Sequence, residues 1–203
     1  EFIPIAEENG MIVPIGMWAL EEACRQLAEW QRTGKIKIGI SVNISVKQLV
    51  AKNFFPVIRK IVMDSSIDPG MLTLEFTESL LLEETELRLR QLNELRKIGL
   101  KLAIDDFGTG FSSFSYLLRL PVNELKIDRS FIEAVPDNQS SCAIVTSIIF
   151  LARQLGLNTV AEGVENESQH RFLKEINCHQ LQGYHFSPPL SAKELFDQNL
   201  SHK

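Results

Sequence analysis

The sequence predicts an α/β protein in which parallel strands are joined by helical crossovers. Six short segments rich in β-branched or other apolar residues alternate with segments whose apolar residues recur at helical spacing. Gly99, Gly156 and the pair Pro69 and Gly70 stand between helical and strand segments, where helix stop signals belong. No linker or low-complexity tract divides the 203 residues, so we expect one domain over residues 1–203.

The strands are expected at residues 37–45, 71–77, 101–106, 124–128, 158–163 and 179–184. The helices are expected at residues 2–10, 13–31, 46–65, 80–98, 112–119, 140–155 and 167–176. This pattern fits either an open doubly wound sheet or a closed barrel. An open sheet usually carries a Gly-rich phosphate loop after its first strand, and the sequence has none. An eight-stranded barrel would need two further strands before residue 1. On composition and pattern alone, both folds remain open.

Composition and charge exclude several classes of function. The chain is 44% hydrophobic and 23% charged with a net charge of −5, which argues against binding to a DNA or RNA polymer or to a membrane surface. The longest apolar stretch, residues 143–157, is interrupted by Arg153 and Gln154 and is too short to span a membrane.

The cysteines and histidines indicate the cellular compartment and argue against two kinds of structural site. Cys24, Cys142 and Cys178 are odd in number and widely spaced, which predicts a reducing compartment rather than a disulfide framework. We therefore expect a cytoplasmic protein, or the cytoplasmic part of a membrane-anchored one. The four histidines lack HExxH spacing, which speaks against a His-rich zinc site.

Polar residues recur late in the expected strands. In residues 38–45 the large apolar side chains alternate with Gly39, Ser41 and Asn43, so the two kinds of residue face opposite sides. The same alternation places a charged side chain opposite the apolar face in the next three strands. The polar residues near the strand ends are Asn43, Glu75, Asp105, Asp106, Lys126 and Glu162.

Gathered at the carboxyl ends of parallel strands, these residues would form one acidic site. Carboxylate and amide oxygens favour Mg²⁺, Mn²⁺ or Ca²⁺ over zinc. Each residue also has a structural interpretation. Asp105 and Asp106 would cap the following helix, and Lys126 would form an ion pair with Asp128. Recurrence on successive strands favours a metal-dependent site.

Six motifs resemble the EAL family of cyclic di-GMP phosphodiesterases. The string DDFGTGFSS at residues 105–113 is similar to the signature loop of this family. The other motifs are SVNIS at 41–45, LEFTES at 74–79, LKIDRSFI at 125–132, AEGVE at 161–165 and LQGYHFSPPL at 181–190. Their order and spacing match the family from Glu1 to about Leu195.

The resemblance implies a modified TIM-type (β/α)8 barrel, with the first two strands missing from this chain, and hydrolysis of cyclic di-GMP to linear pGpG by a two-metal mechanism. It implies two divalent cations, Mg²⁺ or Mn²⁺, bound by Asn43, Glu75, Asp105, Asp106 and Glu162. Lys126 would hold or polarise the attacking water, Glu162 would also act as a base, and Gln182 would contact the water or a ligand. The loop-supporting residues would be Glu78, Gly108, Thr109, Gly110 and Glu165.

The resemblance also implies a bacterial signalling protein that forms a homodimer and carries an attached sensor or GGDEF domain upstream. The name-giving Glu-Ala-Leu motif of the family belongs on a strand before Phe2, and this sequence does not contain it. An alternative function is therefore a catalytically inactive cyclic di-GMP receptor or regulatory module. A barrel glycosidase with two carboxylates is disfavoured by Lys126 beside Asp105 and Asp106, and by the lack of aromatic sugar platforms near the strand ends.

Overall fold

The computed structural model describes residues 2–34, 38–51, 53–78, 85–110 and 117–201. The chain forms two compact units. The first contains Glu1–Phe76, Glu84–Leu102 and Ser191–Lys203, and the second contains Thr77–Glu83 and Ala103–Leu190. Each unit is described by itself. The expected single domain over residues 1–203 stays a prediction.

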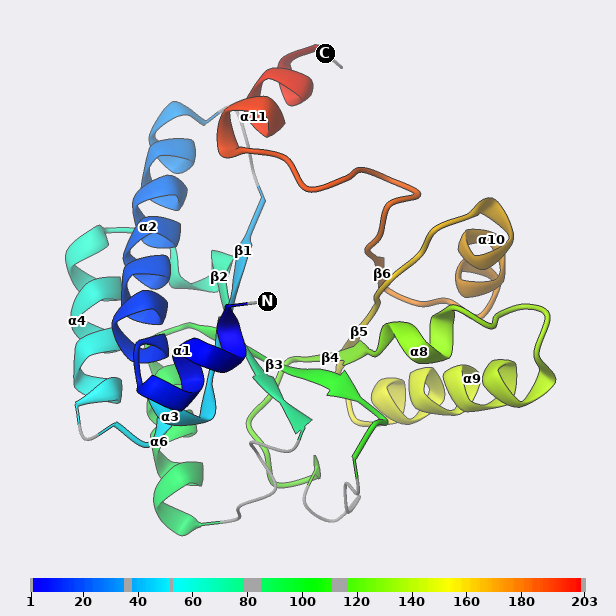
Figure 1. The fold of residues 1–203 in the computed structure, drawn as a ribbon, viewed down its shortest axis with the longest axis horizontal. Coiled ribbons are helices and arrows are strands. Elements are labelled where there is room, and N and C mark those ends of the chain that lie inside the picture. The colour runs from blue at the N-terminus through cyan, green and yellow to red at the C-terminus, as the bar shows by residue number, and fades with distance from the viewer. Residues whose placement is uncertain (1, 35–37, 52, 79–84, 111–116, 202–203) are drawn as a thin grey trace. The chain divides into compact units, whose positions relative to one another are not determined.

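The first unit is built around a long helix. Its helices are α1 (Ile3–Asn9), α2 (Ile12–Thr33), α3 (Val46–Leu49), α4 (Phe54–Ser65), α6 (Glu86–Lys97) and α11 (Ala192–Ser201). Helix α2 buries Leu20, Cys24 and Leu27, whose spacing places them on one helical face. This helix packs against α1, α3, α4 and β1 (Figure 1). Gly34, at a φ of 64°, ends α2 and donates its N–H to the carbonyls of Trp30 and Gln31.

Two parallel strands complete the core of the first unit. They are β1 (Ile40–Ile44) and β2 (Leu72–Thr77), and a short 3-10 helix η1 (Pro69–Met71) precedes β2. In β1, Val42 and Ile44 are buried while Asn43 is exposed, as the sequence alternation predicts. Asn43 lies opposite Glu75 in the register of the two strands. The polar positions of neighbouring strands are thus aligned.

The second unit contains the other four strands. They are β3 (Lys101–Phe107), β4 (Glu124–Ile127), β5 (Asn158–Ala161) and β6 (Gln180–Leu181), and each pairs in parallel with the next. Its helices are α8 (Arg129–Ile132), α9 (Gln139–Gln154) and α10 (Glu167–Glu175). Helix α9 packs against β4 and β5 and also contacts α8 (Figure 1). The predicted alternation of parallel strands and helices is confirmed within each unit.

Several element boundaries differ from the prediction. The helix expected at 46–65 is two helices, α3 and α4. Ser45 and Gln48 form the capping box that starts α3, and Pro56 lies in the first turn of α4, where its missing N–H is tolerated. Helices α8 and α11 were not expected, and β6 is shorter than the predicted strand at 179–184. Residues 37, 52, 80–84 and 112–116 of the predicted elements lie outside the described residues.

Strand β6 is short because the chain turns toward the loop after β5. Gln182 donates its N–H to the carbonyl of Ala161 at 2.8 Å, and Val164 then donates to the carbonyl of Gln182 at 3.0 Å. At Gly183 the two backbones approach so closely that a Cβ atom would lie 2.1 Å from the oxygen of Val164. Only glycine fits this position without a backbone shift.

Among the described residues, no helix is both long enough and apolar enough to cross a membrane.

We predict that Gly183→Ala destabilises the protein by about 3 kcal/mol, because the clash is with backbone atoms that no side-chain rotation can move away. The matched control is Gly156→Ala, where an added Cβ would meet nothing within 4 Å and only the φ of 70° is unfavourable. That control should cost about 1–2 kcal/mol. Urea unfolding of both variants measures the difference, and equal losses would contradict the close approach.

Candidate active site

The carboxyl ends of β3, β4 and β5 bring three charged side chains together. The Nζ atom of Lys126 on β4 lies 2.9 Å from Oδ1 of Asp105 and 2.7 Å from Oε1 of Glu162. Asp105 ends the apolar run of β3, and Glu162 follows β5 directly. The side chain of Lys126 is only 6% exposed, so its charge depends on these two carboxylates rather than on water.

Asp106 adds a third carboxylate beside this ion-pair group. Oxygens of Asp105, Asp106 and Glu162 all lie within 4.8 Å of one another. Burial raises the pKa of Asp106 above its ordinary range, and the negative charges of Asp105 and Asp128 raise it further. Asp106 also has a φ of 53°, a left-handed conformation that aspartate and asparagine tolerate better than most residues. The site therefore concentrates negative charge that a bound cation would balance.

Asp128 lies next to Asp106 and has a separate structural role. It accepts a hydrogen bond from the N–H of Ser130 at 2.9 Å and another from the Ser130 hydroxyl, and so caps the N-terminus of α8. Burial opposes ionisation of Asp128, but the hydrogen bonds from Ser130 outweigh it and hold the pKa below its usual value. The sequence suggested an ion pair of Lys126 with Asp128. The structure instead pairs Lys126 with Asp105 and Glu162.

Glu78 fixes the loop that follows β3. Its Oε2 atom accepts the N–H of Gly108 at 2.8 Å and that of Gly110 at 3.3 Å. Thr109, between them, donates its hydroxyl hydrogen to the carbonyl of Asp106. Gly108 has a φ of 100° and lies against Phe131, so a side chain would be strained there and would also clash. Residues 111–113 of the predicted loop lie outside the described residues.

The remaining residues predicted in this unit lie at the ends of β5 and β6. Glu165 forms an ion pair with Arg129, in which Oε1 lies 2.9 Å from Nη2, and the backbone N–H of Glu165 donates to Oε1 of Gln169 at 2.8 Å. Gln182 follows β6, and its backbone is bonded to the end of β5. Glu165 therefore contacts residues of the neighbouring helices, whereas Gln182 is positioned by the strand pairing.

Asn43 and Glu75 belong to the first unit. They face each other across the β1–β2 register, with Glu75 buried and Asn43 exposed. The structure thus groups the predicted residues into a pair on β1 and β2 and a cluster on β3, β4 and β5. Their combination in one metal site stays a prediction.

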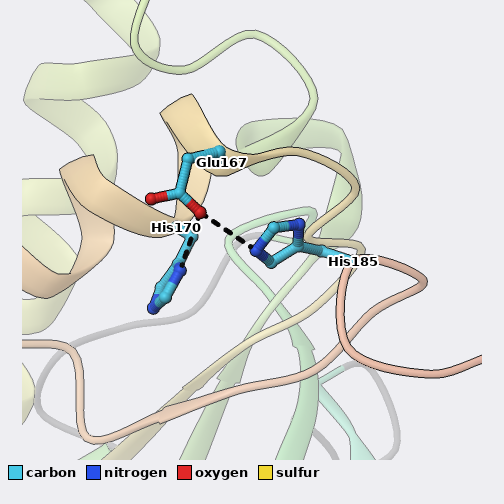
Figure 2. Close-up of side chains that lie close together, drawn as sticks. All are labelled: Glu167, His170 and His185. Carbon is cyan, nitrogen blue, oxygen red and sulfur yellow. Dashed lines mark ion pairs between the residues drawn. The ribbon is translucent and has the colours of Figure 1, made fainter.

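Sequence reasoning missed two groups of polar residues. Arg129 forms ion pairs with both Glu133 and Glu165. The i to i+4 spacing from Arg129 to Glu133 could have predicted the first of these pairs. The second group consists of Glu167, His170 and His185, which lie close together (Figure 2). The histidines come from distant positions, so no local spacing could reveal this group.

The cluster on β3 to β5 fits divalent cations with oxygen ligands. Asp105, Asp106 and Glu162 offer only carboxylate oxygens, the ligand type that Mg²⁺ and Mn²⁺ prefer. Burial is the main cause of the raised pKa of Asp106, and repulsion from Asp105 and Asp128 adds to it; a bound cation would offset both effects. The three carboxylates therefore suit the binding of Mg²⁺ or Mn²⁺.

Fold and site define an α/β protein with an acidic cluster at the carboxyl ends of parallel strands. Residues 1–189 match the model of the EAL domain family. The chain belongs to this family.

Known proteins resemble the chain closely. It is 43% identical over 195 residues to the bifunctional diguanylate cyclase/cyclic di-GMP phosphodiesterase MucR of Pseudomonas aeruginosa, covering 96% of this chain and 28% of MucR. It is 41% identical to the cyclic di-GMP phosphodiesterase NbdA of the same organism, covering 96% of this chain and 25% of NbdA. The chain thus spans about a quarter of the length of these relatives.

A solved structure agrees over nearly the whole chain. The PaMucR phosphodiesterase in complex with c-di-GMP superposes with a TM-score of 0.91 at 43% identity, covering 96% of this chain and 78% of that one. The chain therefore has the TIM-barrel-like α/β fold of EAL structures, and the expected fold class is confirmed.

We predict that Glu78→Ala loosens the loop after β3, because two backbone N–H groups lose a charged acceptor worth about 1–3 kcal/mol. Hydrogen exchange at the Gly108 and Gly110 amides should accelerate, while exchange in α10 stays unchanged. Glu175→Ala, an exposed glutamate at the end of α10, is the control. Unchanged protection of both glycine amides would contradict the anchoring role.

We predict that Asp106→Asn stabilises the protein at pH 7 in the presence of a metal chelator, by about 1 kcal/mol or less. The folded state raises the pKa of Asp106, so ionisation costs stability as the pH rises from the ordinary value of 3.8 through the raised one. Asparagine removes that cost and still suits the left-handed backbone.

Thermal unfolding across the pH range measures this effect. The advantage of Asp106→Asn should vanish at pH values below 3.8, where aspartic acid is protonated in both states. If the Asp106→Asn variant is less stable than the parent at pH 7 with the chelator present, ionisation of Asp106 does not cost stability and the prediction is wrong.

Proposed function

We propose that this protein hydrolyses cyclic di-GMP to linear pGpG with two divalent cations, Mg²⁺ or Mn²⁺. The observation that carries the proposal is Lys126, a buried ammonium held at 2.9 Å and 2.7 Å by carboxylates from the ends of two other strands. The names of MucR and NbdA, and the c-di-GMP complex of a close structural relative, support the choice of substrate.

The acidic residues would hold the cations. Asp105, Asp106 and Glu162 form the cluster on β3 to β5. Asn43 and Glu75, which face each other across the β1–β2 register, would supply two further oxygen ligands. When bound, the two cations would supply Lewis acidity for activation of water and for stabilisation of the leaving oxygen. The carboxylates would be the ligands, and their excess negative charge favours cation binding.

The remaining residues would act on the water and the phosphate. Water adds to one phosphorus, one ester P–O bond of the ring breaks, and the leaving oxygen takes a proton. Glu162 would accept the proton of the attacking water, and Lys126 would hold that water and place positive charge where negative charge grows on the phosphate. Gln182, fixed by its bond to the end of β5, would contact the same water or a ligand position.

The supporting residues would keep this arrangement in place before substrate arrives. Glu78 holds the loop of Gly108, Thr109 and Gly110 directly after Asp105 and Asp106. Glu165 holds the loop after Glu162 through its ion pair with Arg129. Because electrostatic stabilisation requires groups that are already oriented, these anchors would contribute to the rate without touching the substrate.

We predict that Lys126→Met lowers the hydrolysis rate by at least about 10²-fold, the scale of one lost stabilising group. The full-length protein is incubated with cyclic di-GMP and Mg²⁺ or Mn²⁺, and pGpG is measured by chromatography. Lys101→Met, an exposed lysine at the start of β3, is the matched control and should retain the parent rate.

Circular dichroism and ligand binding separate loss of chemistry from loss of fold. A folded Lys126→Met variant that binds cyclic di-GMP and turns it over at the parent rate would refute the role of Lys126. A parent protein that binds cyclic di-GMP but releases no pGpG with either metal would refute hydrolysis and establish a receptor or regulatory module instead.

A further inference from the structure

A second polar cluster lies in the second unit, on α10 and on the segment after β6. Glu167 and His170 are three residues apart on α10 and therefore lie on one helical face. His185 reaches the same point from the segment that follows Gly183. Figure 2 shows one carboxylate oxygen of Glu167 facing both imidazole rings.

The distances in this cluster match those between the ligands of a tetrahedral ion. Oε2 of Glu167 lies 3.5 Å from Nδ1 of His170 and 3.4 Å from Nε2 of His185. Zinc bonds to nitrogen and oxygen of about 2.0–2.2 Å place neighbouring tetrahedral ligands roughly 3.3–3.6 Å apart. One ligand atom from each of the three residues lies within 4.8 Å of the other two. A small rotation of the imidazole rings would bring the distance between their nitrogens into the tetrahedral range as well.

One buried nitrogen atom of this cluster makes no hydrogen bond within the described part of the chain. Nδ1 of His170 is buried and, among the described residues, has no hydrogen-bond partner. The His170 ring is nevertheless held in place by Phe186. The centroid of the Phe186 ring lies 5.4 Å from that of His170 and 5.1 Å from that of His185. The 3.5 Å contact with Glu167 does not form a hydrogen bond to Nδ1 of His170. A buried nitrogen without a hydrogen bond costs free energy, and a metal ion would use its lone pair.

The chemistry of the three ligands selects the ion. Two imidazole nitrogens and one carboxylate oxygen are a set that zinc commonly takes, with a fourth position left for water. Mg²⁺ prefers oxygen ligands and would not compete well here. The nearby Arg171, 3.8 Å from the other oxygen of Glu167, neutralises part of the carboxylate charge but leaves Oε2 to the imidazoles.

We propose that Glu167, His170 and His185 bind one exchangeable Zn²⁺ ion that is distinct from the carboxylate site at β3 to β5. Bound zinc links the segment after β6 to the start of α10. His185 donates its backbone N–H to the carbonyl of Val164 at 3.0 Å, so the linked segment is the one that adjoins Gln182 and the loop after Glu162. This inference does not depend on hydrolysis of cyclic di-GMP.

We expect His170→Gln and His185→Gln each to weaken zinc binding by at least about tenfold, since each removes a ligand. Zinc is titrated into the full-length protein against a chromophoric chelator, with excess Mg²⁺ present to occupy the oxygen site. The control is Glu175→Gln, an exposed glutamate at the other end of α10, which should bind zinc as the parent does.

Two further readouts make the test decisive. Zinc should raise the unfolding temperature of the parent and of Glu175→Gln, but not that of either histidine variant. Cobalt bound in place of zinc should give a tetrahedral visible spectrum without a thiolate charge-transfer band. Burial raises the pKa of the Cys178 thiol, which disfavours that cysteine as a ligand. Equal zinc affinity in the parent and in folded histidine variants, or a thiolate band, would overturn the proposal.

Discussion

The structure of the acidic site depends on the buried ammonium of Lys126. A lysine ammonium that is 6% exposed has little water to solvate its charge, and Asp105 and Glu162 supply compensating negative charge. The same contacts draw the ends of β3, β4 and β5 together, so strand register and charge pairing reinforce each other. One ammonium faces three carboxylates when Asp106 is included, which leaves excess negative charge. That imbalance is unfavourable in the isolated chain and is what makes the site receptive to cations.

Much of the fold was predictable because strand residues alternate and helix residues recur with a period near 3.6. The alternation in β1 and the buried face of α2 follow directly from the sequence. The break between α3 and α4 was also readable, since Pro56 fits only the first turn of a helix. Likewise, Ser191 and Glu194 form the reciprocal bonds that start α11. The shortness of β6 was not readable, because it arises from a backbone contact between Gly183 and Val164 across the fold.

The site was predictable to a similar degree. Polar residues late in successive strands identified Asp105, Lys126 and Glu162, because parallel strands end at the same edge of a sheet. Pairing was harder to predict. Asp128 is only two residues from Lys126 in sequence, yet it caps α8, since its strand has ended and its side chain faces the first N–H groups of that helix. Glu78 and the glycines it binds are some thirty residues apart, so only the motif resemblance predicted their contact.

The close approach of the backbone at Gly183 means that positions near the end of the chain differ in how well they tolerate substitution. Any side chain at 183 would displace Val164 and the bonds that fix Gln182, so substitutions there should be eliminated by selection. Positions 170 and 185 already carry side chains, one on α10 and one on the segment after β6, so a change there does not create the backbone clash described for Gly183. We therefore expect a histidine at either position to be gained or lost more readily than the glycine at 183. Sensitivity to a second metal would then evolve independently of the chemistry at the strand ends.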